Sequence, residues 1–246
     1  MTFNTDAVVI RMIKTGSSDR LLTLLTSDRG VVKVYANSAQ RPKSKLHACS
    51  NLFCYGSFGI YDGGKELKVT ECELKEIFYD LRSDITVLAA AQYFCEITAD
   101  LAAGAGENGG ELLRLMLNTF YYLSRGDIDP RLMKPMYELR LLSDIGFMPS
   151  LVACESCGAF ETEPMYFSPV TGGLRCADCG PADGTYKKTS LAAVTAMRHI
   201  CYSELRQFFT LRVDAAALSE LSALSERYLL ERAGRRFGSL EFLKSL

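Results

Sequence analysis

The sequence has no tryptophan, only two histidines and a formal net charge of −1 over 246 residues. So small a net charge excludes a uniformly basic nucleic-acid coat protein. The chain contains no run approaching the about 18 apolar residues that span a bilayer, and its start has no apolar signal core. It also lacks a phosphate-binding glycine loop, a His-Glu-x-x-His motif and a Gly-x-Ser-x-Gly motif. These absences predict a cytoplasmic protein with no membrane contact, no small-molecule substrate and no catalytic centre.

Hydrophobic residues make up 48% of the chain and charged residues 23%, so the chain can bury a core and is not disordered as a whole. Its length fits one large domain or two to three small ones. The nine cysteines are an odd number, which in a reducing compartment argues against a disulfide framework.

The first 80 residues have the pattern of β structure. Short segments rich in Val, Ile and aromatic residues alternate with Gly, Ser and Asp turns. These predicted strands are residues 7–13, 21–26, 31–35, 51–61 and 67–74. The connection at residues 37–50 is long and polar. Five strands with uneven loops predict a Greek-key barrel of the OB type, and an SH3-like barrel fits the same pattern nearly as well.

Beyond residue 81 the apolar residues recur with helical spacing. Helices are predicted at residues 84–103, 112–120, 129–146, 190–209 and 214–232, with Asp84 and the Asp129-Pro130 pair as N-terminal signals. The fold class is therefore α+β and multidomain. We expect an OB-type domain at 1–80, a helical domain at 81–149 and 185–246, and a turn-rich insertion at 150–184.

Four of the cysteines form two Cys-x-x-Cys pairs with 18 residues between them. The candidate ligands are Cys154, Cys157, Cys176 and Cys179. This spacing predicts a structural Zn²⁺ site, in which four protein ligands leave no open position for catalysis. Unmetallated thiols, a redox dithiol and an iron site are the alternatives. The other five cysteines have no such spacing and are expected to be small buried hydrophobes.

Positive charge is concentrated near the start of the chain. Residues 1–50 contain eight Lys and Arg against three acidic residues, an excess of five, whereas residues 51–80 contain three against six. Basic residues beside aromatic ones are typical of a single-strand binding groove, although a solvated loop explains the same run. The candidate DNA-binding residues are Arg11, Lys14, Arg20, Lys33, Arg41, Lys43 and Lys45.

A second basic cluster lies near the end of the chain. It consists of Arg227, Arg232, Arg235 and Arg236. A solvated helix end and a contact with phosphate or a protein partner both fit this cluster.

Three blocks of the chain together resemble one known family. The first is DRLLTLLTSDRG at residues 19–30, followed by RPKSKL at residues 41–46. The second is ELRLLSDIG at residues 138–146, followed by Pro149 and the two cysteine pairs. The third is RRFGSLEFL at residues 235–243. With these blocks in order from end to end, the chain resembles the RecO family of bacterial DNA repair and recombination mediators. It departs from the family pattern at Ser18, where the family often has an acidic residue, and at Asn37-Ser38, where the family often has glycine.

The resemblance implies an N-terminal OB domain, a helical domain and a zinc knuckle inserted in the latter. It also implies binding of single- and double-stranded DNA, annealing of complementary strands and loading of RecA onto strands coated by single-strand binding protein. The implied partners are RecR, RecF, RecA and the C-terminal tail of single-strand binding protein, at the nucleoid. A zinc-ribbon adaptor that binds only proteins and an enzyme of another kind are the alternative functions.

Overall fold

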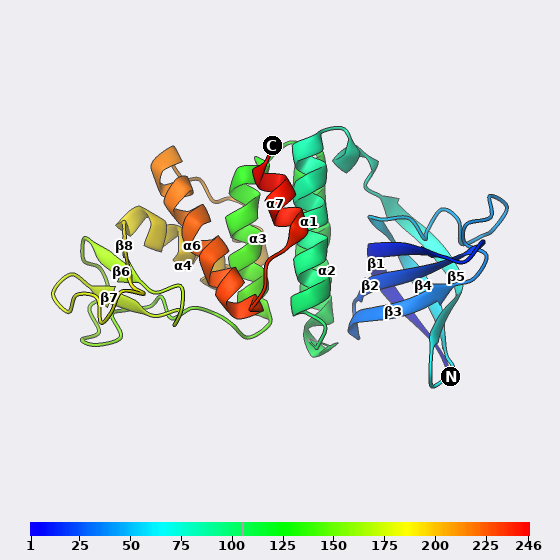
Figure 1. The fold of residues 1–246 in the computed structure, drawn as a ribbon, viewed down its shortest axis with the longest axis horizontal. Helices are drawn as coiled ribbons and strands as arrows, with labels where there is room; N and C mark the ends of the chain where they lie inside the picture. Colours follow the sequence, from blue (N-terminus) through cyan, green and yellow to red (C-terminus); the bar gives the residue numbers. More distant parts are fainter. Residues whose placement is uncertain (105) are drawn as a thin grey trace. The chain divides into compact units, whose positions relative to one another are not determined.

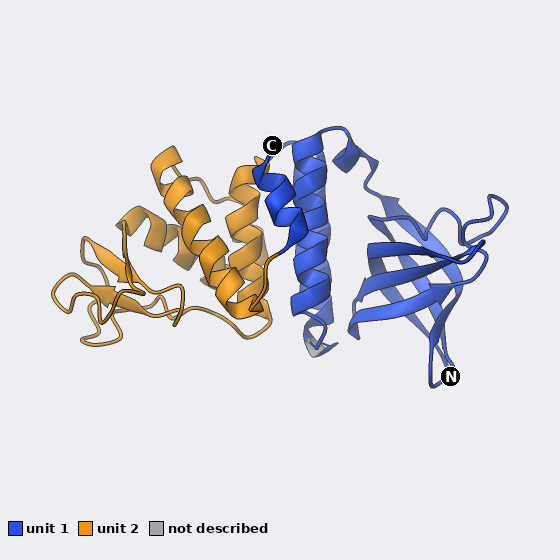
Figure 2. Cartoon of the chain, viewed as in Figure 1, with its two compact units in different colours: residues 1–128, 237–246 blue, residues 129–236 orange. Residues whose placement is uncertain are grey.

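The computed structural model describes residues 1–104 and 106–246, and the chain divides into two compact units (Figure 2). Unit 1 consists of Met1–Ile128 and Phe237–Leu246, and unit 2 consists of Asp129–Arg236. The chain therefore passes from unit 1 into unit 2 and returns to unit 1 for its last ten residues. The expected four-part division, with boundaries after residues 80, 149 and 184, is finer than this and stays a prediction.

Five strands in unit 1 form a closed barrel in the order β1-β2-β3-β5-β4 (Figure 1). They are β1 (Thr2–Thr15), β2 (Asp19–Thr26), β3 (Gly30–Ala36), β4 (Cys54–Asp62) and β5 (Leu67–Ile77). Barrel closure depends on a parallel pairing of β3 with β5 and an antiparallel pairing of β1 with β4. This arrangement confirms the predicted OB-type barrel.

The barrel core consists of the inward-facing side chains of alternate strand positions. Fully buried examples are Val9, Leu24 and Val34 in the first three strands, and Phe58 and Ile60 in β4. The strands are rich in β-branched and aromatic residues, which favour extended backbone and pack well on a pleated surface. The segments rich in these residues in the sequence therefore correspond to the strands of the barrel.

The helices of unit 1 are η1 (Tyr79–Arg82), α1 (Ile85–Leu101), η2 (Gly106–Asn108), α2 (Gly109–Ser124) and α7 (Gly238–Lys244). Asp84 caps α1 as predicted, because its carboxylate accepts hydrogen bonds from the backbone N–H groups of Thr86 and Val87. The sequence analysis missed α7. This helix packs on α1, and the backbone N–H of Ser239 donates to the Glu96 carboxylate at 3.2 Å.

Helix α2 begins against the turn between β2 and β3. A Cβ added to Gly109, its first residue, would lie 2.6 Å from the carbonyl oxygen of Thr26 and 2.8 Å from the backbone nitrogen of Gly30. Both atoms belong to the backbone and cannot move aside alone. The absence of a side chain at Gly109 therefore lets α2 pack on the barrel.

Replacing Gly109 with alanine is expected to lower the free energy of unfolding by about 1–3 kcal/mol, the usual effect of overpacking. Helix propensity alone would favour alanine here by about 1 kcal/mol. A fall in the free energy of unfolding would therefore indicate overpacking, and a rise would indicate helix propensity. Urea unfolding followed by circular dichroism measures the change. Gly104→Ala is the matched control, since a Cβ there would meet nothing within 4 Å. A Gly109→Ala protein as stable as the unaltered chain would contradict the packing argument.

Unit 2 contains four helices and a three-stranded sheet in the order β7-β6-β8. Its elements are α3 (Pro130–Asp144), β6 (Met165–Phe167), β7 (Leu174–Cys176), β8 (Lys187–Thr189), α4 (Leu191–Tyr202), α5 (Leu205–Phe208) and α6 (Ala215–Ala233). Among the described residues, no helix has both the length and the apolar character needed to cross a membrane.

The prediction of one helix over residues 190–209 is wrong. The chain leaves the helical conformation at Ser203, which has φ −77° and ψ 152°, and a second short helix begins at Leu205. The Ser203 backbone N–H donates to the carbonyl of His199 at 3.1 Å and its hydroxyl donates to the same oxygen at 2.5 Å. Local hydrogen bonding by serine competes with the helix here, without a glycine or proline to mark the break.

A charged cluster lies between α3 and α6. The Lys134 ammonium lies 2.9 Å from one Glu138 carboxylate oxygen and 3.1 Å from Glu226, and the Ser225 hydroxyl donates to the second Glu138 oxygen at 2.6 Å. Glu138 is fully buried and Lys134 is 6% exposed. The cluster therefore joins the two helices through charges that water does not screen.

Candidate nucleic-acid interface and candidate metal centre

A β-bulge in β1 turns Arg11 toward solvent. The register against β2 shifts between Val9 and Arg11, which makes Ile10 an extra residue. On a regular strand Val9 and Arg11 would share a face, but Val9 is in the core and Arg11 is exposed on the outer side. Arg11 pairs with Thr23, which pairs with the exposed Lys33. The bulge thus places one cation at each end of a row across three strands, which we call the cationic row.

The next outward row lies two residues further along the same strands. Ile13 pairs with Leu21, Leu21 pairs with Tyr35, and Tyr35 pairs with Lys68 of β5. The sequence analysis included Lys33 among the candidate DNA-binding residues but did not include Lys68. Only the parallel closure of the barrel brings β5 next to β3, and no local pattern signals that pairing.

Residues 37–53, here named the basic loop, are held at their start by Asp19. The Asp19 carboxylate accepts a hydrogen bond from the Ser38 backbone N–H at 2.7 Å, and the Gln40 amide donates to the Asp19 carbonyl at 2.7 Å. The Ser38 N–H, the Ser18 hydroxyl and the nearby charge of Arg41 hold the pKa of Asp19 below its ordinary value. Asp19 is therefore ionised and fixes the departure of the loop from the barrel.

Arg20 holds the other end of the basic loop. Its guanidinium donates to the Ser50 hydroxyl at 2.7 Å, the Asn51 side-chain oxygen at 3.0 Å and the His47 carbonyl at 3.3 Å. The residue is only 6% exposed. A guanidinium placed in this way would have to abandon three partners to reach a phosphate. The predicted DNA contact of Arg20 therefore has no support in this geometry, and the residue positions the loop instead.

The middle of the basic loop faces solvent. Leu46 and Cys49 are buried in the barrel core, which ties down the segment that follows the basic residues. Arg41, Lys43 and Lys45 are exposed. Lys14, another predicted contact, is exposed near the end of β1, opposite Arg20 in the register. Anchored at both ends, the loop presents a short cationic segment.

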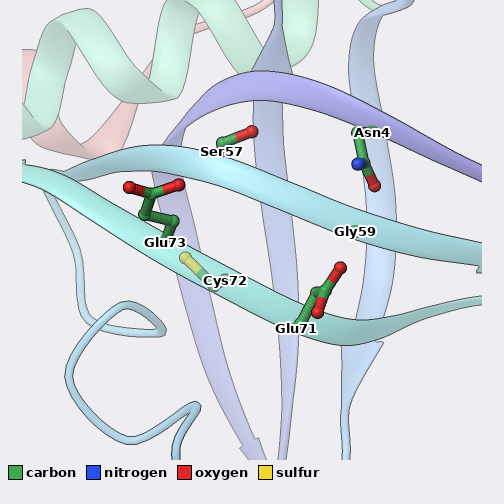
Figure 3. Close-up of a pocket in the computed structure, with 6 residues that line it drawn as sticks. All are labelled: Asn4, Ser57, Gly59, Glu71, Cys72 and Glu73. Atoms are coloured by element: carbon green, nitrogen blue, oxygen red, sulfur yellow. The ribbon is translucent and has the colours of Figure 1, made fainter.

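A shallow hollow of about 250 Å³ lies on another side of the barrel, over β1, β4 and β5 (Figure 3). Its lining residues are Asn4, Ser57, Gly59, Glu71, Cys72 and Glu73. Figure 3 shows the Glu71 and Glu73 carboxylates extending from β5. Two negative charges repel a phosphate backbone. A nucleic acid is therefore expected to meet the side that carries the cationic row and the basic loop.

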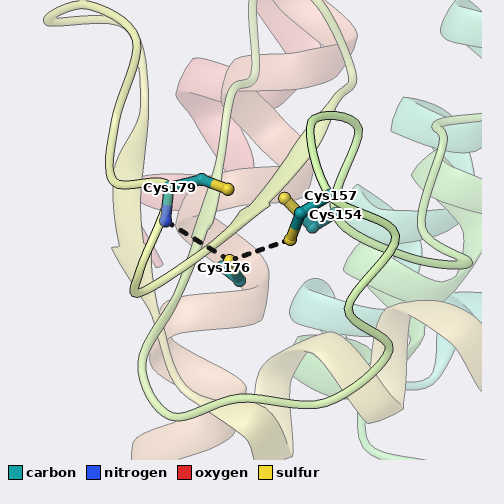
Figure 4. Close-up of side chains that lie close together, drawn as sticks. All are labelled: Cys154, Cys157, Cys176 and Cys179. Carbon is teal, nitrogen blue, oxygen red and sulfur yellow. Dashed lines mark hydrogen bonds between the residues drawn. The ribbon is translucent and has the colours of Figure 1, made fainter.

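In unit 2 the structure brings the four predicted cysteine ligands together (Figure 4). All four Sγ atoms lie within 4.8 Å of one another, and those of Cys157 and Cys176 are 3.5 Å apart. Thiolates that share one tetrahedral ion at about 2.3 Å would lie roughly 3.8 Å apart, so the cluster fits such an ion closely. The group could hold a metal ion.

Each cysteine pair lies in a turn that only glycine completes easily. The residues after the pairs, Gly158 and Gly180, have φ of +75° and +62°, a conformation that side chains with a Cβ rarely adopt. Their backbone N–H groups donate to the carbonyls of Cys154 and Cys176 at 2.9 and 3.0 Å. The two turns have the same hydrogen-bonding pattern and present their thiols to one point.

The cysteine thiols of the cluster differ in acidity. Burial raises the pKa of Cys154, but the backbone N–H groups of Cys176, Cys157 and Ser156 outweigh it and lower that pKa to about 6. A hydrogen bond with Cys157 is the main cause that raises the pKa of Cys179 to about 12. A metal ion binds thiolates, so binding must displace protons from this cluster.

Glu155 braces the two cysteine turns independently of a metal. Its carboxylate accepts a hydrogen bond from Arg175 at 2.9 Å and another from the Tyr186 hydroxyl. Chiefly the Tyr186 hydroxyl, and then Arg175, hold the pKa of Glu155 below its ordinary value, although burial opposes them. Since Arg175 precedes Cys176, the ion pair links the first turn to the strand that leads into the second.

The remaining cysteines are mostly buried, as predicted. Cys49, Cys54, Cys95 and Cys201 are no more than 5% exposed, whereas Cys72 is half-buried at the hollow. Burial raises the pKa of both Cys54 and Cys201 to about 11, so these two thiols stay protonated at neutral pH.

Arg227 and Arg232, near the end of unit 2, have partners within it. Arg227 pairs with Glu231 at 2.7 Å, one helical turn away. Arg232 donates to the carbonyl of Val170 at 2.5 Å. These contacts give both residues a structural explanation, and a phosphate contact is not needed to account for them.

The chain matches two family models and many curated relatives. Residues 1–78 match the model described as Recombination protein O N terminal, and residues 82–241 match Recombination protein O C terminal. DNA repair protein RecO of Acetivibrio thermocellus is 34% identical over 242 residues, which cover 98% of this chain and 96% of that protein. DNA repair protein RecO of Desulforudis audaxviator is 32% identical over 246 residues, with 99% and 97% covered. The matches extend over both units and show that the chain belongs to the RecO family of DNA repair proteins.

Proposed function

We propose that the protein is a non-enzymatic recombination mediator, which binds DNA, anneals complementary strands and helps load RecA onto single strands coated by single-strand binding protein. The observation that supports this most is an OB barrel with a cationic row and an exposed basic loop, in a chain of the RecO family. An annealing protein must neutralise phosphates on two strands and tolerate any sequence. Exposed Lys and Arg do both by displacing counterions, without catalytic groups.

Six of the predicted cations are proposed to contact phosphate. They are Arg11, Lys14, Lys33, Arg41, Lys43 and Lys45. Arg11 and Lys33 belong to the barrel wall and have fixed backbone positions, whereas the three loop cations extend from a segment held only at its ends. The barrel cations then fix the path of the strand, and the loop cations add affinity.

Replacing Arg41, Lys43 and Lys45 together with alanine is expected to weaken DNA binding and to flatten its salt dependence. Each lost phosphate contact on a single strand removes about 0.7 from the slope of log K against log salt, so the slope should fall by about 2. Fluorescence anisotropy of a labelled oligonucleotide over a salt series measures both quantities.

The matched control removes three exposed cations from unit 2, as Lys187→Ala, Lys188→Ala and Arg206→Ala in one protein. This variant has the same net charge as the loop variant, and its slope should stay unchanged. Equal losses in the two variants would show a general charge effect and would count against a specific role of the basic loop.

Annealing tests the mediator activity and its partners together. Complementary oligonucleotides coated with single-strand binding protein should pair faster when the protein is added, with RecR as the proposed partner and RecF, RecA and the tail of single-strand binding protein as further contacts. Annealing that proceeds on bare strands but not on coated ones would remove the proposed contact with the coating protein. The proposal places the protein at the nucleoid in the cytoplasm, where these strands occur.

The ion proposed for the cysteine cluster is Zn²⁺. Four thiolates in a tetrahedral arrangement match the preference of zinc and leave no position for water or substrate. The ion would therefore be held by Cys154, Cys157, Cys176 and Cys179 and would stabilise the fold of unit 2. All contacts with DNA would then be made by protein side chains and not by the ion.

A further inference from the structure

Three of the cysteines outside the metal cluster lie together in the barrel. Cys49 of the basic loop and Cys54 at the start of β4 belong to the barrel core, and Cys72 of β5 packs against that core. The thiols of Cys49 and Cys72 hydrogen-bond to each other. Cys54 has a different partner, because its thiol donates to the Ala48 carbonyl at 3.2 Å. The group therefore contains one pair of thiols in direct contact, Cys49 and Cys72.

Cys72 connects this pair with solvent. Cys49 is only 2% exposed, whereas Cys72 is half-buried and lines the hollow of about 250 Å³ over β1, β4 and β5 (Figure 3). The residue of β4 that lies against the Cys72 sulfur is Gly56, where an added Cβ would be 3.2 Å from that sulfur. A small solute that enters the hollow can therefore approach the pair without unfolding of the barrel.

The two thiols differ in acidity. The hydrogen bond from Cys72 lowers the pKa of Cys49 although burial opposes it, and the backbone N–H of Cys49 and the charge of Arg20 act in the same direction. The same hydrogen bond is the main cause that raises the pKa of Cys72, and burial and the Glu73 carboxylate add to it. Cys49 is thus the better nucleophile of the pair. An acidic thiol beside a second thiol that can resolve its oxidation is typical of redox-sensing sites.

We propose that Cys49 and Cys72 form an oxidation site, at which hydrogen peroxide joins the basic loop to β5 through a reversible disulfide. The Cys49 thiolate attacks one peroxide oxygen and the O–O bond breaks. Cys49 becomes a sulfenic acid, and the hydroxide that leaves takes up the proton that Cys49 had lost. The Cys72 sulfur then attacks the Cys49 sulfur, and the displaced hydroxide leaves as water with the Cys72 proton. Two thiols and one peroxide thus give one disulfide and two waters.

The disulfide would restrain the segment in which the basic loop returns to the barrel. Cys49 lies between His47 and Ser50, both of which accept hydrogen bonds from Arg20, and close to the buried Leu46. Packing and hydrogen bonds hold this segment in the reduced chain, and a covalent bond to β5 is added by oxidation. If the loop binds phosphate as proposed, the mobility of that contact then depends on oxidation. The reaction of the thiols does not itself depend on DNA binding.

The test maps the disulfides of the full chain after treatment with hydrogen peroxide. Remaining thiols are blocked with N-ethylmaleimide, and the chain is digested with trypsin without reductant. Mass spectrometry should find the peptide of residues 46–65, which contains Cys49 and Cys54, joined to the peptide of residues 69–75, which contains Cys72. Fragment ions that separate Cys49 from Cys54 should place the bond at Cys49. Dithiothreitol should remove the link.

Cys54→Ala is the matched control, since it removes the third thiol of the group and should keep the link, which Cys49→Ala should lose. Hydrogen exchange of residues 46–53 should be slower in the oxidised chain than in the reduced one. A bond at Cys54, or no link between the two peptides, would overturn the inference. Faster exchange after oxidation would overturn the restraint of the loop. Failure of the proposed function would leave all these results unchanged, because none of the measurements uses DNA.

Discussion

Replacing Cys154 with serine is expected to unfold the region around the cysteine cluster and to abolish metal binding. Structural zinc sites of this kind contribute an apparent binding free energy of about 10–16 kcal/mol at neutral pH, which no other interaction in so small a region matches. The sheet here has three strands of three residues each and cannot hold its fold by packing alone. Elemental analysis should find about one zinc per unaltered chain and none per variant chain.

Hydrogen exchange should then show loss of protection in residues 150–189 of the variant. The matched control is Cys201→Ala, which removes a buried thiol from the same unit but outside the cluster and should keep its metal. Zinc affinity of the unaltered chain should fall as pH is lowered, because protons compete for the thiolates and the raised pKa values of Cys157 and Cys179 mean that binding must displace their protons. A gently purified chain without metal, or a fully protected variant, would contradict the metal proposal.

Replacing Glu138 with glutamine is expected to destabilise unit 2 by about 3–5 kcal/mol, the usual effect of removing one partner from a buried ion pair. Glu138 is fully buried, and its two carboxylate oxygens accept from Lys134 and Ser225. Glutamine keeps the shape but not the charge, so the Lys134 ammonium would remain buried with only Glu226 to balance it. Urea unfolding followed by circular dichroism measures the loss.

Glu226→Gln is the matched control for that prediction. Its carboxylate also pairs with Lys134, but its side chain is 19% exposed, so water compensates for part of the change and the loss should be smaller. Similar losses for the two variants would show that burial of Glu138 is not the deciding factor. DNA binding at low temperature, where both variants stay folded, should be unaffected because neither residue belongs to the barrel.

The features that sequence analysis predicted well are those with local causes. Segments rich in Val, Ile and aromatic residues, separated by turn residues, located the five strands, and the capping side chain of Asp84 located the start of α1. The cysteine spacing identified the cluster that could hold a metal ion because each pair occupies one short turn. A glycine follows each pair because the backbone there has a positive φ. Such signals need no knowledge of the rest of the chain.

The features that it missed depend on contacts between distant segments. Arg20 looks like any other cation of the basic region, but the return of the loop at residues 47–51 buries it. Lys68 becomes a neighbour of Tyr35 only when the barrel closes. The bulge at Ile10 reverses the face of Arg11, and it depends on the pairing of β1 with β2. Tertiary structure determines the surroundings of each of these residues, and neither the charge nor the periodicity of the sequence reveals them.

The return of the chain to unit 1 has a consequence for protein synthesis. A ribosome releases the barrel and helices α1 and α2 first, yet α7, the last element of unit 1, follows the whole of unit 2. At about 5–20 residues per second, the intervening segment takes on the order of ten seconds to make. During that interval α1 exposes the surface that α7 later covers, including Tyr93, on which Phe237 packs in the finished chain. A nascent chain stalled before residue 237 is therefore an incomplete unit 1 joined to a complete unit 2, and is a natural substrate for chaperones.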